Sequence, residues 1–156
     1  MKPRRATSAD AQELVRLRNL MFEALSPPSD VDWQSRCVEA FADRLKPDSA
    51  LAAFVIGDGT HRLFACAVGE YAKRLPSPGS AAPHIGHVHS VVTEPSHRHR
   101  GLGSACLTAL MRWLAEHDCS HVQLRASSEG QGLYLRLGFQ VVADVHMAWR
   151  ERPCDE

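Results

Sequence analysis

The sequence has no excess of either charge, no long apolar run and no internal repeat. Its 156 residues include 18 Lys and Arg and 18 Asp and Glu, giving a net charge of +0 with neutral histidine. A nucleic-acid binder would normally carry a basic excess. A membrane span needs roughly 18 consecutive apolar residues, and a secretory signal needs an apolar segment after its positive start. The sequence has neither, so we expect no nucleic-acid partner, no membrane partner and no signal peptide.

Paired cysteines are also missing. The cysteines are odd in number, scattered and outside any Cys-x-x-Cys pair; they are Cys37, Cys66, Cys106, Cys119 and Cys154. This usage is typical of reduced thiols in a cytoplasmic protein. The length predicts one domain, residues 1–156, large enough to bury a core without disulfides.

Residues 86–112 hold the strongest local pattern in the sequence. Gly86 to Thr93 is rich in valine and predicts a buried strand, which Pro95 ends because proline cannot donate to a ladder. From Leu102 onward, apolar residues recur at helical spacing. The pattern therefore predicts a strand, a basic turn with two glycines, and a helix.

The turn from Arg98 to Gly103 has the properties of an anion site. A helix start leaves about four backbone N–H groups unpaired and carries a partial positive charge. Glycines allow close approach to a ligand, and two arginines add cations. A solvated basic loop is the alternative. The Rossmann fingerprint is excluded because Cys106 replaces its third glycine, and the P-loop because no lysine separates Gly103 from Ser104.

The remaining pattern predicts alternating helices and strands. We expect strands at 2–6, 49–56, 63–71 and 120–126, helices from Thr7 or Ser8 to 25 and from about Asp30 or Val31 to 45, and a helix break at 26–29. Residues 74–83 are expected to form a loop, and 127–138 a short helix closed by Gly138. Residues 139–145 and 146–150 are predicted to form a closing strand pair.

Two motifs in order give the sequence a family resemblance. The first is Arg98-His99-Arg100-Gly101-Leu102-Gly103, and the second is Tyr134-Leu135-Arg136-Leu137-Gly138-Phe139. They resemble the acetyl-CoA signature and the Tyr-x-x-x-Gly-Phe segment of the GCN5-related N-acetyltransferase (GNAT) superfamily. The resemblance implies an α/β (α+β) fold with a mixed, splayed sheet of about 6–7 strands and helices on both faces.

The resemblance also implies acetyl transfer from acetyl-CoA to a primary amine by direct attack, with a small-molecule amine as partner. A homodimer is a possible assembly. It implies that acetyl-CoA contacts the following residues: Val91, Val92, Thr93, Arg98, His99, Arg100, Gly101, Leu102, Gly103, Ser104 and Ser127. Ser127 stands where the family often has asparagine. By the resemblance, Tyr134 would protonate the leaving thiolate. Without the resemblance, its position beside apolar residues indicates a core residue.

His87 and His89 are two apart, so both side chains point to one face of the predicted strand. A histidine has the right pKa to take a proton from an amine near neutral pH, which makes the pair candidate general bases. The alternative is a pair of ordinary core or surface histidines. The His-x-His strand is similar to that of the arylalkylamine (serotonin) branch of the superfamily, which implies that His87 and His89 form the proton path.

Two further interpretations concern a metal site and the binding of the acceptor amine. Histidines cluster at His84, His87, His89, His97 and His99, but no acidic or cysteine ligand falls at a typical spacing, so we expect no metal. A His-metal hydrolase and a non-catalytic acyl-CoA-binding module are the rival functions. The resemblance implies that the first two helices and their connection surround the amine. Their apolar and acidic residues would suit a cationic amine, or would simply be core and solvated surface; they are Met21, Phe22, Trp33, Glu23, Asp30 and Asp32.

Overall fold

The computed structural model describes residues 1–25, 30 and 32–150. The chain separates into two compact units, residues 1–125 and 126–156. The predicted helix break at 26–29, Val31 and Cys154 lie outside the described residues.

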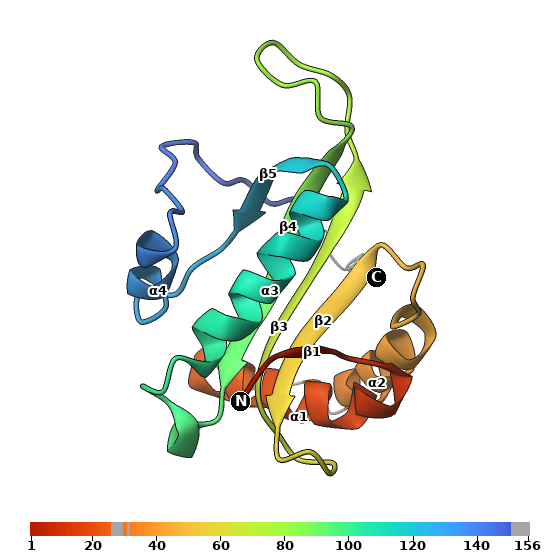
Figure 1. The fold of residues 1–156 in the computed structure, drawn as a ribbon. Coiled ribbons are helices and arrows are strands. Elements are labelled where there is room, and N and C mark those ends of the chain that lie inside the picture. The colour runs from red at the N-terminus through yellow and green to blue at the C-terminus, as the bar shows by residue number, and fades with distance from the viewer. Residues whose placement is uncertain (26–29, 31, 151–156) are drawn as a thin grey trace, which may run out of the picture. The chain divides into compact units, whose positions relative to one another are not determined.

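The first unit is built on a mixed sheet of five strands in the order β1-β2-β3-β4-β5 (Figure 1). The strands are β1 (Arg4–Arg5), β2 (Leu51–Gly57), β3 (Leu63–Lys73), β4 (His84–Thr93) and β5 (Cys119–Leu124). Neighbours run antiparallel except β4 and β5, which are parallel. A parallel pair needs a crossover, and here a helix supplies it.

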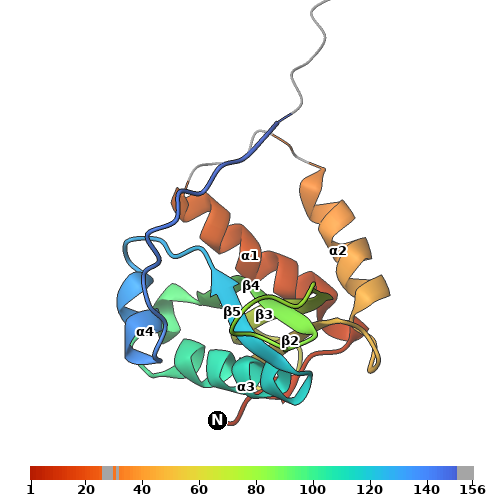
Figure 2. The same ribbon diagram turned by 90° about the horizontal axis from the view of Figure 1, so that it is seen from above.

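Helices cover both faces of this sheet, as predicted (Figure 2). On one face lie α1 (Ala11–Leu25), which follows the short helix η1 (Ser8–Asp10), and α2 (Trp33–Arg44). On the other lies α3 (Leu102–Glu116), the crossover from β4 to β5, which the short helix η2 (Pro95–His97) precedes. Within the described residues, no helix is both long and apolar enough to cross a membrane.

Apolar stripes on the helices make the two layers of the core. Leu14 and Leu17 of α1 are fully buried against sheet residues such as Val68. Leu107, Leu110 and Leu114 of α3 are fully buried as well. Each such side chain contributes about 1.5–3 kcal/mol to folding, so packing fixes α1 and α3 on the sheet.

The second unit contains α4 (Gln131–Arg136), a shorter helix than the predicted 127–138. Gly138 follows it with φ 91°, and the Phe139 N–H donates a hydrogen bond to Tyr134 O at 3.1 Å. The predicted glycine stop is therefore confirmed. Glycine accepts this left-handed conformation without strain.

The predicted strand number is too high. Residues 139–150 are described but form no strand, so the expected pair at 139–145 and 146–150 is wrong and the sheet has five strands rather than 6–7. The valines of this segment have β preference, but preference alone does not hold a strand without a partner ladder. The strand predicted at 2–6 is likewise reduced to Arg4–Arg5.

Candidate functional site

The turn after β4 is exposed and contains two residues with left-handed backbone. His99 and Gly101 have φ of 62° and 74°, and Arg98 and Arg100 are exposed. Arg98 Nε lies 3.4 Å from Thr93 O. Neither arginine forms an ion pair with a described residue, so both charges are available to a ligand.

Helix α3 begins beside this turn and points its first N–H groups toward it. The first hydrogen bond of the helix runs from Ala105 N to Gly101 O, at 3.0 Å. The N–H groups of Leu102, Gly103 and Ser104 come before it and have no acceptor within the helix. A Cβ on Gly103 would lie 2.9 Å from Thr93 Oγ1. Only glycine lets the helix start come this close to the end of β4.

Strand β4 has an open edge next to the turn. It pairs with β5 from His84 to Val88, where the ladder ends at Leu124. On its other edge it stays paired with β3 as far as Thr93. The backbone from Val91 to Thr93 therefore has no strand partner on the β5 side among the described residues, and that edge can pair with an extended ligand.

A β-bulge arranges the two histidines of β4. Val68 pairs with Ser90 and Gly69 with Val88, so His89 is the extra residue between them. The His87 and His89 rings lie 4.7 Å apart at 69°. The structure thus brings both predicted histidines together, and the bulge lets Ser90 face α1 beside them.

A carboxylate holds His89 in place. His89 Nε2 lies 2.8 Å from Glu70 Oε1, and Arg44 forms an ion pair with the same carboxylate. Burial raises the pKa of Glu70, but hydrogen bonds from Arg44 and His89 outweigh it, and the net pKa is lowered. Burial, followed by the charges of His89 and Arg125, lowers the pKa of His87 despite the opposing charge of Glu70. His87 is therefore neutral at neutral pH and can accept a proton.

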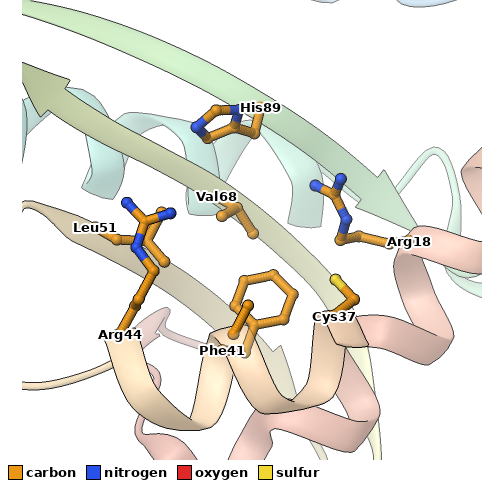
Figure 3. A pocket seen from close by; sticks show the side chains of 8 residues that line it. Arg18, Cys37, Phe41, Arg44, Leu51, Val68 and His89 are labelled. Atoms are coloured by element: carbon orange, nitrogen blue, oxygen red, sulfur yellow. The ribbon is translucent and has the colours of Figure 1, made fainter. Parts of the chain in front are cut away.

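A small cavity lies beside His89 (Figure 3). Its volume is about 170 Å³, and residues from α1, α2, β2, β3 and β4 line it: Arg18, Cys37, Ala40, Phe41, Arg44, Leu51, Val68 and His89. In Figure 3, Arg18 and Arg44 reach toward the His89 side of the cavity with Phe41 and Val68 between them. The cavity has an apolar floor and cationic walls.

The residues expected around a cationic amine do not line this cavity. The Phe22 and Trp33 rings pack edge to face at 5.1 Å, Glu23 accepts a hydrogen bond from Asn19, and Asp30 pairs with Arg36. These side chains serve the helix pair, in line with the alternative interpretation. Sequence reasoning missed Arg18, Arg44 and Glu70; their only signal was polar residues on otherwise apolar faces.

Tyr134 and Ser127 belong to the second unit. Tyr134 lies on α4 and its ring packs edge to face against Phe139 at 5.8 Å. The Gly130 N–H donates to Ser127 Oγ at 3.2 Å, and the Gln131 N–H donates to Ser127 O at 3.0 Å. Ser127 thus has a local role at the start of α4.

Two other histidines of the sequence cluster, His84 and His97, have local partners of their own. His84 Nδ1 lies 2.8 Å from His117 O, and the His97 ring stacks on Phe64 at 4.0 Å. Across residues 1–25, 30 and 32–150, no three His, Cys, Asp or Glu side chains are placed to hold a metal ion.

The family model for the acetyltransferase (GNAT) family matches residues 17–139, so the chain belongs to that family. A mycothiol acetyltransferase from Acidimicrobium ferrooxidans is 32% identical over 103 residues, which is 64% of this chain; the chain spans about a third (32%) of that relative's length.

Solved structures share the fold. One is a GCN5-related N-acetyltransferase from Ralstonia eutropha (TM-score 0.81, 22% identity, 95% of this chain and 97% of that one). Another is a predicted acetyltransferase with acetyl-CoA from Clostridium acetobutylicum (TM-score 0.79, 21% identity, 97% of this chain and 95% of that one). The membership confirms the superfamily expected from the two motifs.

Proposed function

We propose that the protein transfers an acetyl group from acetyl-CoA to a primary amine by direct attack. The open edge of β4 carries this proposal, because it lies between a cationic turn and a pair of histidines. That order matches a ligand with a diphosphate at one end and a reactive thioester at the other.

The turn and the start of α3 would bind the diphosphate. Arg98 and Arg100 supply charge, and the N–H groups that follow Gly101 supply donors. The pantetheine arm would then run along Val91 to Thr93 as an additional strand. A free N–H of this segment would stabilise the tetrahedral oxyanion, an effect of roughly 3 kcal/mol for one donor.

The histidines would manage the proton of the amine. The nitrogen must lose a proton as it attacks the carbonyl carbon of the thioester and the C–S bond breaks. His87, with its lowered pKa, and His89, oriented by Glu70, are the acceptors, directly or through water. In this proposal Tyr134 returns a proton to the thiolate of CoA, and Ser127 lies near the cosubstrate.

Two wider expectations accompany this function. The family match crosses from the first unit into the second, which supports one acetyltransferase domain over 1–156. Cys37, Cys66, Cys106 and Cys119 are free thiols, which supports a reducing, cytoplasmic setting.

The variant His87→Gln with His89→Gln tests the proposal. Turnover with acetyl-CoA and an amine is measured by the release of the CoA thiol. We expect it to fall by about 100-fold, the usual scale for a lost general base. Acetyl-CoA affinity should not change. His61→Gln, an exposed histidine in the β2–β3 turn, is the matched control. An unchanged rate in the double variant removes both histidines from the mechanism, and binding of acetyl-CoA without transfer to any amine would indicate a binding module.

A further inference from the structure

The cavity beside His89 has more positive than negative charge. Arg18 and Arg44 both line it. Glu70 pairs with Arg44 and also bonds to His89, so this carboxylate offsets the charge of Arg44. The uncompensated charge is that of Arg18.

Arg18 is poorly satisfied by the protein. Among the described residues, its side chain donates from Nη1 to Ser90 Oγ at 3.2 Å, and the Cys37 thiol also lies beside it. Its Nε is covered from solvent and has no acceptor, and no carboxylate of the described residues forms an ion pair with it. Arg16, two residues earlier on α1, shows the contrast: it pairs with both Glu13 and Glu94. A guanidinium has five N–H donors, and a bound anion can accept from those that no protein group uses.

The position of Arg18 relates it to the reacting groups. Ser90, its partner, follows His89 on β4, and Arg18 and His89 line the same cavity. Three further lining residues are apolar and buried: Phe41, Leu51 and Val68 are 5%, 4% and 1% exposed. At about 170 Å³ the cavity is smaller than the roughly 300 Å³ at which ligand pockets usually begin, so it suits a small molecule or one end of a larger one.

We propose that the acceptor is a small primary amine that also carries an anionic group, a carboxylate or a phosphate, which Arg18 binds while the amine faces His89. This inference rests on the proposed function and names its substrate class. Arginine suits the task because its planar fork of donors matches carboxylate and phosphate oxygens. Phe41, Leu51 and Val68 would contact the apolar body between the two polar ends.

A purely structural role for Arg18 predicts something different. The guanidinium lies 5.3 Å from the centre of the Phe22 ring, one turn along α1, and its bond to Ser90 connects α1 with β4. Loss of such a role would lower activity toward every amine alike. Loss of anion recognition would affect charged acceptors only, and mainly through KM.

The experiment compares matched acceptors on the full chain with acetyl-CoA. The pairs are L-leucine with L-leucinamide, and γ-aminobutyrate with its amide; O-phosphoethanolamine with ethanolamine distinguishes phosphate from carboxylate. The variants are Arg18→Gln and Arg18→Lys, with Arg36→Gln as control, because Arg36 lies on α2 outside the cavity and its side chain is 62% exposed.

We expect the wild type to prefer the charged acceptor of a pair. Arg18→Gln should lower kcat/KM for that charged acceptor about 10- to 100-fold, while kcat/KM for the neutral acceptor changes less than threefold. Arg18→Lys should restore part of the loss.

The outcomes separate this inference from the proposed function. Equal use of charged and neutral amines, or an equal loss for both in Arg18→Gln, overturns the inference and leaves the acetyltransferase activity standing. If no amine is acetylated, binding decides: the melting temperature is measured with N-acetyl-L-leucine and with N-acetyl-L-leucinamide in the presence of CoA. Stabilisation by the acid alone, lost in Arg18→Gln, supports the anion site although the transfer reaction fails. No difference between the two overturns the anion site.

Discussion

His87 shows how its surroundings set the behaviour of one residue. Its side chain is half-buried, next to a second histidine and within the field of Arg125. Burial disfavours the charged imidazolium, and the nearby positive charges do so as well. A histidine that stays neutral below its ordinary pKa is ready to accept a proton over a wider pH range.

The pH profile of the reaction should reflect this. Because the neutral form is the base and its pKa is lowered, the acid limb of kcat/KM for acetyl-CoA, at saturating amine, should fall below pH 6.5. Arg125→Gln removes a positive charge, so it should raise the pKa of His87 and move the limb to higher pH. Glu70→Gln removes a negative charge and should move it to lower pH. Shifts in the same direction for both variants would contradict the role of His87, and Arg112→Gln on α3 should leave the limb unchanged.

At the scale of elements, the start of α3 and the end of β4 form one structure. The helix is held by its buried leucines, and Gly103 allows its first turn to approach Thr93 closely. The N–H groups of that turn are thereby set at a fixed position beside the open edge of β4. An anion bound there would align the rest of its molecule along the strand.

The arginines of the turn can be tested by dissecting the cosubstrate. Arg98→Ala with Arg100→Ala should weaken binding of acetyl-CoA by about tenfold, because two charge-assisted contacts are lost. Acetyl-pantetheine lacks the diphosphate, so its KM should hardly change. Arg112→Ala, a cation farther along α3, is the control. Equal losses for the two thioesters would mean that the diphosphate lies elsewhere.

For the first unit as a whole, a buried ionic network ties distant segments together. Glu94 is 7% exposed and follows β4. It accepts a hydrogen bond from Arg16 of α1 at 2.7 Å and pairs with Arg62, which directly precedes β3. Arg16 in turn donates to Leu63 O at 2.7 Å. One carboxylate therefore connects a helix with the ends of two strands.

Removing that carboxylate should destabilise the fold. Glu94→Ala leaves partly buried arginine donors without their acceptor, which we expect to lower the free energy of unfolding by about 1–3 kcal/mol. Urea denaturation followed by circular dichroism measures it. The control is Asp43→Ala, which breaks the exposed pair with Lys46, whose side chain is 65% exposed. An exposed pair contributes about 0–1 kcal/mol; a loss no larger than this for Glu94→Ala would contradict the role of the network.

The local pattern was enough to predict the strand, basic turn and helix start within residues 86–112, because each depends on neighbours in sequence. Valines favour a strand, Pro95 ends it, and glycines permit the turn and the close helix start. The same is true of the glycine stop at Gly138. The two motifs that carry the family resemblance lie in these segments.

Only the tertiary structure decided the rest of the site, because its parts come from elements far apart in the chain. Arg18, Arg44, Glu70 and His89 meet through packing of α1 and α2 on the sheet, and the bulge at His89 exists only in the register with β3. Residues 139–150 show the converse, since β preference without a partner ladder produced no strand there. The order of residues determines local turns and helix starts. The charge of a cavity depends on which distant side chains the fold brings to face each other.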